Sequence, residues 1–225
     1  MYKKIGLVIA DDAEFAPVLQ ISDELGGEKF TRHGRDYCRF FKNGVEFVAI
    51  WSKVGKVNAA AMTAALICEE KPECIINFGL SGAVSGVFKN ELVLGTKFIE
   101  HDFDLTSLGY ELGQKPQEKY IFESDPELNS VILNADASIC KGVCVTGDIF
   151  ITTKEKRDTV VSKFGANCCD METAAIASVC YDFKLPFAAL RYMSDDADDS
   201  SITTYRKVYE LKKDSMIRII LKAFC

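Results

Sequence analysis

The sequence predicts one α/β domain over residues 1–225, with helices packed on a mostly parallel or mixed central sheet. Short apolar runs alternate with helical patterns along the whole chain, no Pro- or Gly-rich linker divides it, and no repeat period is present. A length of 225 residues with 48% hydrophobic residues is also sufficient for one sizeable core.

The first predicted element is a buried strand at Ile5–Ala10, an unbroken apolar run. Asp11 or Asp12 then caps a helix, in which Pro17 is tolerated only near the start. Glu14 falls in the first turn of that helix, where the helix dipole favours a carboxylate even without any catalytic role.

The middle of the chain continues the alternation of strands and helices. Strands are expected as an antiparallel meander at 29–46, and at 47–51, 74–78, 92–99 and 142–146; helices are expected at 59–68, 125–134 and 154–164. Gly79–Gly86 is expected to form a glycine-rich turn. The loop at 101–116 is long for a compact domain, which is typical of functional or interface segments.

The C-terminal third repeats the pattern. A short strand at 167–170 leads into an Ala-rich helix that ends near Phe183, and Pro186–Leu190 reads as a buried strand. Polar residues follow that strand at 191–198. Taken alone, this stretch is as typical of a solvated acidic loop as of a strand end that binds a ligand. Thr203–Phe224 is expected to form the closing helix.

Composition excludes several classes of partner. A net charge of −6 disfavours a nucleic-acid backbone, and no apolar run approaches the roughly 18 residues of a membrane helix. The N-terminus lacks the apolar core of a signal peptide, so we expect a cytoplasmic protein. The nine cysteines are odd in number and form no Cys-x-x-Cys pair, which indicates reduced structural thiols and neither a zinc site nor any other metal site.

Polar groups follow four of the predicted strands: Asp11–Glu14, Gly79–Gly82, Asp170–Glu172 and Arg191–Asp198. If these strands are parallel, the four ends converge on one rim of the sheet, where ligands bind in open α/β proteins. Paired carboxylates in different environments suit glycosidic-bond cleavage, in which one protonates the leaving group and the other activates water. The alternative is that all four groups are solvated surface residues.

Five stretches carry a further pattern, namely Val54–Ala60, His101–Thr106 with Gly109–Tyr110, Thr146–Ile151, Asp170–Ala175 and Ser194–Asp198. Together they resemble the 5′-methylthioadenosine/S-adenosylhomocysteine nucleosidases of the nucleoside phosphorylase/nucleosidase superfamily, in family order over nearly the whole chain. The resemblance implies a three-layer α/β/α fold with a twisted, mixed sheet. It also implies a cytoplasmic homodimer of methionine salvage, with the 101–116 loop at the interface and no cofactor.

The implied activity is hydrolysis of the N-glycosidic bond between adenine and a 5′-thio-substituted ribose. Asp195 takes the position of the acid that protonates purine N7, and Glu14 that of the base that orients the attacking water. The remaining residues implied to bind the purine nucleoside are Gly82, Phe150, Ile151, Met171, Glu172, Arg191, Ser194 and Tyr205.

The chain departs from the family pattern at several places in the expected site, among them Leu80 and Asp11. Leu80 stands where the family has a serine near the water, and Asp11 aligns with an apolar residue near the 5′-thio group. An acidic side chain fits a methylthio tail poorly and suits a hydroxyl or an amine better. The 5′ substituent and the rate are therefore open.

Three alternatives remain. A related purine nucleosidase with another 5′ preference is consistent with Asp11 and Leu80. A purine nucleoside phosphorylase requires arginines or amides for phosphate, whereas the predicted rim carries acids that repel it. A nucleoside binder that lost catalysis is favoured by Leu80 alone, and a binder does not require an acid–base pair.

Overall fold

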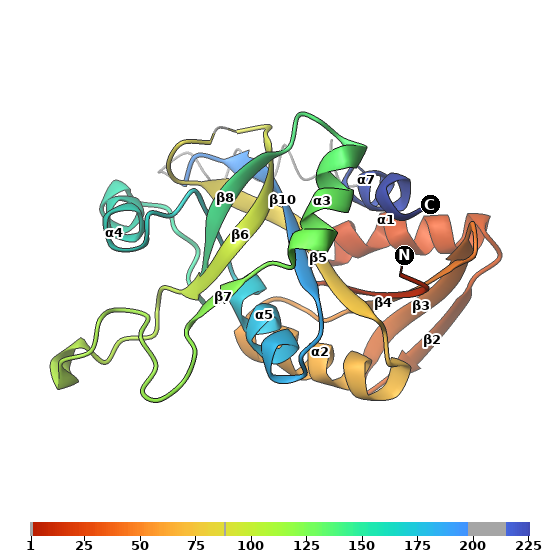
Figure 1. The fold of residues 1–225 in the computed structure, drawn as a ribbon, viewed down its shortest axis with the longest axis horizontal. Coiled ribbons are helices and arrows are strands. Elements are labelled where there is room, and N and C mark those ends of the chain that lie inside the picture. Colours follow the sequence, from red (N-terminus) through yellow and green to blue (C-terminus); the bar gives the residue numbers. More distant parts are fainter. Residues whose placement is uncertain (1, 88, 198–214) are drawn as a thin grey trace.

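The computed structural model describes residues 2–87, 89–197 and 215–225 and is built around one mixed sheet with helices on both faces (Figure 1). Four strands run parallel, in the order β4 (Val45–Trp51), β1 (Lys4–Ile9), β5 (Cys74–Ala83) and β10 (Phe187–Asp195). Most of their residues are buried, as expected for strands covered on both faces. The carboxyl ends of β1, β5 and β10 therefore lie side by side.

An antiparallel meander continues the sheet beyond β4. It consists of β2 (Glu28–Arg32) and β3 (Arg35–Lys42), joined to each other and to β4 by two-residue turns. Both turns, His33–Gly34 and Asn43–Gly44, have positive φ at both positions, which the tightest hairpin turns require. The predicted meander is confirmed.

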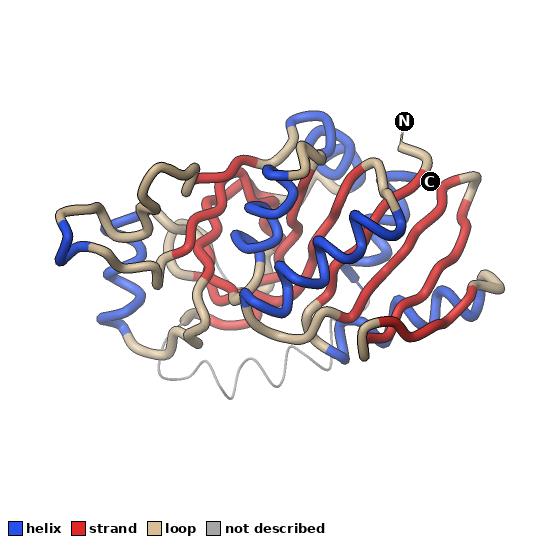
Figure 2. Tube along the Cα trace, turned by 90° about the horizontal axis from the view of Figure 1, so that it is seen from below, coloured by secondary structure: helices blue, strands red, loops and turns tan. Residues whose placement is uncertain are grey.

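The other half of the sheet closes on itself. The strands β6 (Leu92–Glu100), β8 (Cys140–Thr146) and β9 (Cys168–Asp170) connect β10 to β5, and β10 also pairs directly with β5. These five strands form a ring, visible at one end of the molecule in Figure 2. The short β7 (Ile121–Glu123), which the sequence pattern did not predict, pairs with β6.

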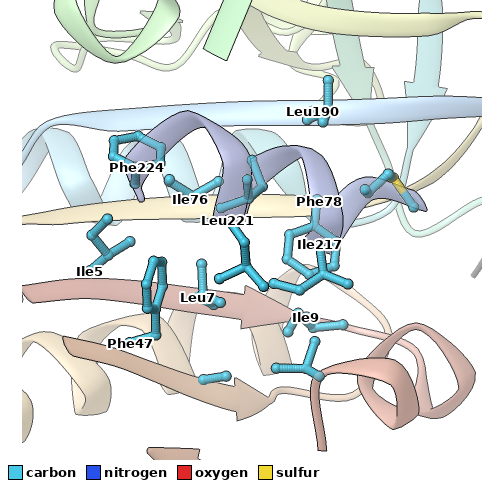
Figure 3. Close-up of a cluster of buried hydrophobic side chains, with 14 of the residues drawn as sticks. Ile5, Leu7, Ile9, Phe47, Ile76, Phe78, Leu190, Ile217, Leu221 and Phe224 are labelled. Carbon is cyan, nitrogen blue, oxygen red and sulfur yellow. The ribbon is translucent and has the colours of Figure 1, made fainter. Parts of the chain in front are cut away.

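Helices complete three layers. The core residues of α1 (Asp12–Glu24), α3 (Pro126–Ala135) and α7 (Ser215–Phe224) pack with Leu7, Phe78 and Leu190 on one face of the sheet (Figure 3). Those of α2 (Lys56–Glu70) and α5 (Thr173–Asp182) pack on the other face. The predicted α/β class with a mixed central sheet is confirmed. The helix α4 (Lys154–Phe164) and the 3₁₀ turn η1 (Thr106–Leu108) contribute no residue to either of these two core clusters.

Two predicted boundaries are wrong, because strands extend into segments read as turns. Gly79–Ala83 continues β5, since β10 and β9 supply backbone partners to this stretch. Strand β10 likewise runs through Arg191 to Asp195 instead of ending at Leu190. The premise of four parallel strand ends is also wrong, because β9 runs antiparallel to β5. Of the predicted closing helix, only Ser215–Phe224 falls within the described residues.

None of the described helices is both long enough and apolar enough to cross a membrane.

Candidate active site

A pocket of about 210 Å³ opens where β1, β5 and β10 end. Its wall combines these strand ends with the start of α1, the β9–α5 connection and the segment that precedes α4. The lining includes every substrate-site residue predicted from the sequence within the described residues: Glu14, Gly82, Phe150, Ile151, Met171, Glu172, Arg191, Ser194 and Asp195. Tyr205 lies outside the described residues. The departures Asp11 and Leu80 also line the pocket.

Glu14 is a buried carboxylate at one side of this pocket. The first turn of α1 places it there, and the Leu80 N–H donates to its Oε1 at 2.7 Å. Burial raises the pKa of Glu14 to about 8; the negative charges of Asp11 and Glu172 add to the rise, while the Leu80 N–H and the charge of Arg191 oppose it. A carboxyl group with this pKa can exchange a proton near neutral pH, as a general base must.

Arg191 is held rigidly beneath the pocket. Its side chain is 2% exposed, its Nε lies 3.1 Å from Asp170 Oδ2, and its Nη2 donates to Asn77 Oδ1 and to Thr173 Oγ1. The Asp170 carboxylate is itself fixed by the Thr146 hydroxyl at 2.6 Å. Because a buried cation without partners is costly, this network explains why a polar residue, Asn77, interrupts the apolar run of β5.

Glu172 is the second buried carboxylate with a raised pKa. It lies at the start of α5, and the Gly55 N–H donates to its Oε1 at 2.8 Å. Gly55 has φ of +100°, a conformation that other residues rarely adopt, so the turn that holds Glu172 requires glycine. Burial raises the pKa of Glu172 to about 7; the charge of Asp170 adds to the rise, and Arg191 opposes it.

Asp195 occupies the end of β10, where its pairing with β5 shifts register between Met193 and Asp195. Such a bulge re-aims the side chains at a strand end. Asp195 is 1% exposed, and its carboxylate accepts from the Ser194 hydroxyl at 2.7 Å and from the Ala197 N–H at 3.0 Å. Across the strand pair, a Cβ on Gly82 would lie 3.2 Å from Asp195 Oδ1, so glycine leaves room for this carboxylate.

Apolar residues form the rest of the wall. Ile149, Phe150 and Ile151 precede α4. Met171 lies between Asp170 and Glu172, where β9 leads into α5. Phe150 lines the pocket and is 43% exposed. An apolar wall facing a carboxylate-rich floor suits a ligand with a flat aromatic part and a hydroxylated part.

Glu14 and Arg191 both approach Gly79 closely. A Cβ built there would lie 2.7 Å from Arg191 Nη1 and 2.8 Å from Glu14 Oε2. Glu14 and the buried arginine therefore both lie where a side chain at position 79 would project, so glycine is required there. The sequence pattern marked the glycine-rich stretch but assigned no role to Gly79, Asn77 or Thr173; a polar residue inside an apolar strand was the available signal.

Gly79→Ala is expected to destabilise the protein by about 1–3 kcal/mol, because the methyl group overpacks a filled, polar interior. Thermal unfolding measures this loss. Combining it with Glu14→Ala should recover part of the loss, since the carboxylate that the methyl group crowds is then gone. Losses that simply add would show that Glu14 and position 79 do not share this space.

No group of three or more His, Cys, Asp or Glu side chains in the described part of the chain is arranged to hold a metal ion. All nine cysteines are free thiols, and six of them are buried.

Comparison with known proteins gives concordant results. The model of the phosphorylase superfamily matches residues 4–224. A relative from an Exiguobacterium strain, described as a 5′-methylthioadenosine/S-adenosylhomocysteine nucleosidase, is 32% identical over 188 residues, which cover 80% of this chain and 81% of that protein.

Two solved structures from Helicobacter pylori share the fold. The 5′-methylthioadenosine/S-adenosylhomocysteine nucleosidase, solved with butyl-thio-DADMe-Immucillin-A, matches with a TM-score of 0.94 at 26% identity, covering 99% of this chain and 97% of that one. The native futalosine hydrolase matches with a TM-score of 0.93 at 25% identity, again covering 99% of this chain and 97% of that one.

Proposed function

We propose that the pocket described above is the active site of a hydrolase, because the chain belongs to the phosphorylase superfamily and, within it, to the 5′-methylthioadenosine/S-adenosylhomocysteine nucleosidases. The enzyme hydrolyses the N-glycosidic bond of a 5′-substituted adenosine and releases adenine and the substituted ribose. The observation that carries the residue assignment is the pair of buried carboxylates, Glu14 and Asp195, in one pocket.

In the proposed reaction, one of these two carboxyl groups acts on the leaving base and the other acts on the attacking water. Asp195 in its protonated form donates to purine N7, so the electrons of the C1′–N9 bond leave with a neutral base. Glu14 accepts a proton from the water whose oxygen bonds to C1′. We place that water beside the Glu14 carboxyl group, which lines the pocket.

The carboxylates also stabilise the charge that develops on the sugar. As the C1′–N9 bond breaks, the ribose becomes oxocarbenium-like, and fixed negative charges nearby lower the barrier. Glu172, held by the Gly55 N–H, would bind the ribose hydroxyls from the side of α5. Met171 would pack on the sugar, while Phe150 would stack on the purine and the Ile151 backbone would read its edge.

The charge of the pocket favours water over phosphate as the nucleophile. Among the described residues that line it, five are acidic, and Arg191 is the one cation. Arg191 already pairs with Asp170, Asn77 and Thr173. Among the described lining residues, a phosphate dianion would meet the carboxyl groups of Glu14 and Asp11, and Arg191 is the one cation there to offset them. This argument disfavours the phosphorylase alternative.

Adenine release is therefore expected to be independent of phosphate. The test measures adenine released from methylthioadenosine, S-adenosylhomocysteine and adenosine, each with and without phosphate, with inosine as the control for the base. Release that requires phosphate would identify a phosphorylase and remove Glu14 as the base. Tight binding without release would identify a nucleoside binder, and faster release from inosine would favour a nucleosidase with another base preference.

The assembly, location and pathway are further parts of the proposal. We propose a homodimer in which the 101–116 loop caps the partner's pocket. The loop projects away from the sheet in Figure 1, and its Leu108 is 70% exposed. A cytoplasmic role in methionine salvage and a single domain over residues 1–225 complete the proposal. The pathway rests on the family resemblance, and the single domain rests on the unbroken alternation of strands and helices.

A further inference from the structure

Two carboxylates that lie outside the pocket connect two parts of its wall. Asp102 follows β6 and Asp148 follows β8, and neither is among the described residues that line the pocket. The parallel pairing of these strands places Glu100 opposite Thr146, so the segments that leave the two strands begin side by side. The proposed reaction assigns no role to either carboxylate.

Asp102 accepts hydrogen bonds at both of its carboxylate oxygens. Its Oδ1 accepts from the Lys56 ammonium group at 2.6 Å, and its Oδ2 accepts from the Asp148 N–H at 2.9 Å. Asp148 completes the arrangement, because its Oδ1 accepts from the Lys56 N–H at 2.8 Å. The three residues therefore form a closed hydrogen-bonded cycle, which fixes the start of α2 against the segment that precedes α4.

Each of the two elements that the cycle joins carries a part of the proposed substrate site. Gly55, immediately before Lys56, donates to Glu172 Oε1 at 2.8 Å and so holds the carboxylate assigned to the ribose. The wall assigned to the base, residues 150–151, begins two residues after Asp148 and lines the same pocket. The cycle therefore bears on how far the ribose-binding carboxylate lies from the base-binding wall.

The cycle is charged and mostly buried. The side chains of Lys56 and Asp102 are 18% and 14% exposed. Burial alone would raise the pKa of Asp102, but the bonds from Lys56 and from the Asp148 N–H lower it below its ordinary value, so the carboxylate is ionised at neutral pH. An ionised carboxylate accepts at both oxygens, whereas an amide accepts at one end and donates at the other. An asparagine at position 102 therefore cannot satisfy both donors.

Glu100 separates the charge of this region from the connection that Asp102 makes. Its Oε2 accepts from Lys56 Nζ at 3.0 Å, and its Oε1 accepts from Lys115 Nζ at 2.5 Å. Glu100 thus links Lys56 to the 101–116 loop, whereas Asp102 links it to the segment before α4. Because Lys56 keeps a charged partner when Asp102 is neutralised, the loss specific to Asp102 is the connection between the two parts of the wall.

We propose that Asp102 is a positioning residue of the active site, which joins the start of α2 to the segment before α4 and thereby sets the spacing between Glu172 and the base-binding wall. A nucleoside contacts both parts at once, through its ribose and its base, whereas a free base reaches only the base-binding side. A spacing that is fixed in advance lowers the cost of ordering both parts around one ligand. This inference rests on the proposed function, because that function assigns Glu172 to the ribose.

The test compares two ligands that differ only in the sugar, 9-deazaadenosine and its free base 9-deazaadenine. The sugar is attached through a carbon–carbon bond that water does not cleave, so calorimetry measures equilibrium dissociation constants. The readout is the Kd of the base divided by the Kd of the nucleoside. The variant is Asp102→Asn. Glu100→Gln is the matched control, because it also removes a negative charge from Lys56 and its side chain is similarly buried, at 12% exposed.

Asp102→Asn should lower this ratio about tenfold, because one of its two donors loses its acceptor and the spacing is no longer fixed. Glu100→Gln should leave the ratio unchanged. Asp148→Ala opens the same cycle at the Lys56 N–H and should lower the ratio as well, so it carries the test if Asp102→Asn does not fold. A ratio that is unchanged in a folded variant of the cycle, or that falls equally in Glu100→Gln, would overturn the inference.

The ratio also separates a positioning role from a structural one. A residue that only stabilises the fold lowers the melting temperature and leaves the relative affinities of the folded protein for the two ligands as they were. Binding of both ligands to the wild type, with a ratio that Asp102→Asn does not change, would overturn this inference alone. Failure of both ligands to bind the wild type would overturn the proposed function, and this inference with it.

Discussion

Glu14→Gln is expected to lower kcat for adenine release about a thousandfold, while the dissociation constant of the substrate changes little. Glutamine keeps the size of the side chain and can still accept from the Leu80 N–H, but it cannot take a proton from water. Single-turnover kinetics measures the loss, and calorimetry measures binding. Glu24→Gln, an exposed change on the same helix, is the matched control.

The pH dependence gives an independent check on Glu14. Because its pKa is raised to about 8, kcat/KM of the wild type should rise with pH up to about pH 8. Asp11→Asn should move this rise to lower pH, since the charge of Asp11 is one cause of the raised pKa. A rate that is flat between pH 5 and 9 would contradict Glu14 as the base.

The same raised pKa predicts a change in stability. The folded state binds the Glu14 proton more tightly than the unfolded state, so this group destabilises the fold as pH rises from about 4.5 to about 8. Glu14→Gln removes the effect. The melting temperature of the variant relative to the wild type should therefore increase over that range, and an unchanged difference would indicate that Glu14 is ionised without cost.

Asp195→Asn is the second large expected effect, again about a thousandfold in kcat. Asparagine can occupy the same bulge and accept from the Ala197 N–H, but it supplies no acidic proton to purine N7. The leaving base then departs as an anion. The measurement is adenine release under single-turnover conditions, with Asp196→Asn, the exposed neighbour, as the control.

A leaving-group test distinguishes an acid from a merely structural residue. A substrate whose base leaves readily without protonation should lose much less activity in Asp195→Asn than the adenine substrate loses. Equal losses on both substrates would show that Asp195 holds the site together and does not protonate the base.

Local sequence patterns predicted most of the elements and much of the pocket wall. The apolar run of β1 followed by an Asp cap defines a strand and a helix from neighbours alone, and this fixes Glu14 in a first turn. The family resemblance named eight further residues of the site, which line the same pocket as Glu14 in the structure. Their catalytic roles stay predictions until the variants are measured.

The extents of strands were predicted less well, because they depend on partners distant in the chain. Gly79–Ala83 has the composition of a turn, yet it is strand, since β10 on one side and β9 on the other satisfy its backbone. A glycine-rich sequence does not reveal such partners. The pairing also explains how β9, although antiparallel to β5, delivers Glu172 to the pocket.

The sequence by itself determined the α/β class, the family and the set of polar residues at the strand ends, because periodicity, capping and motif order are local properties of the chain. Only the tertiary structure decided that five strands close into a ring, that Asn77 and Thr173 hold Arg191, and that Glu14 and Arg191 both approach Gly79. It also decided the pKa of Glu14. Burial and long-range pairing create these properties, and both arise from residues that are far apart in the chain until it folds.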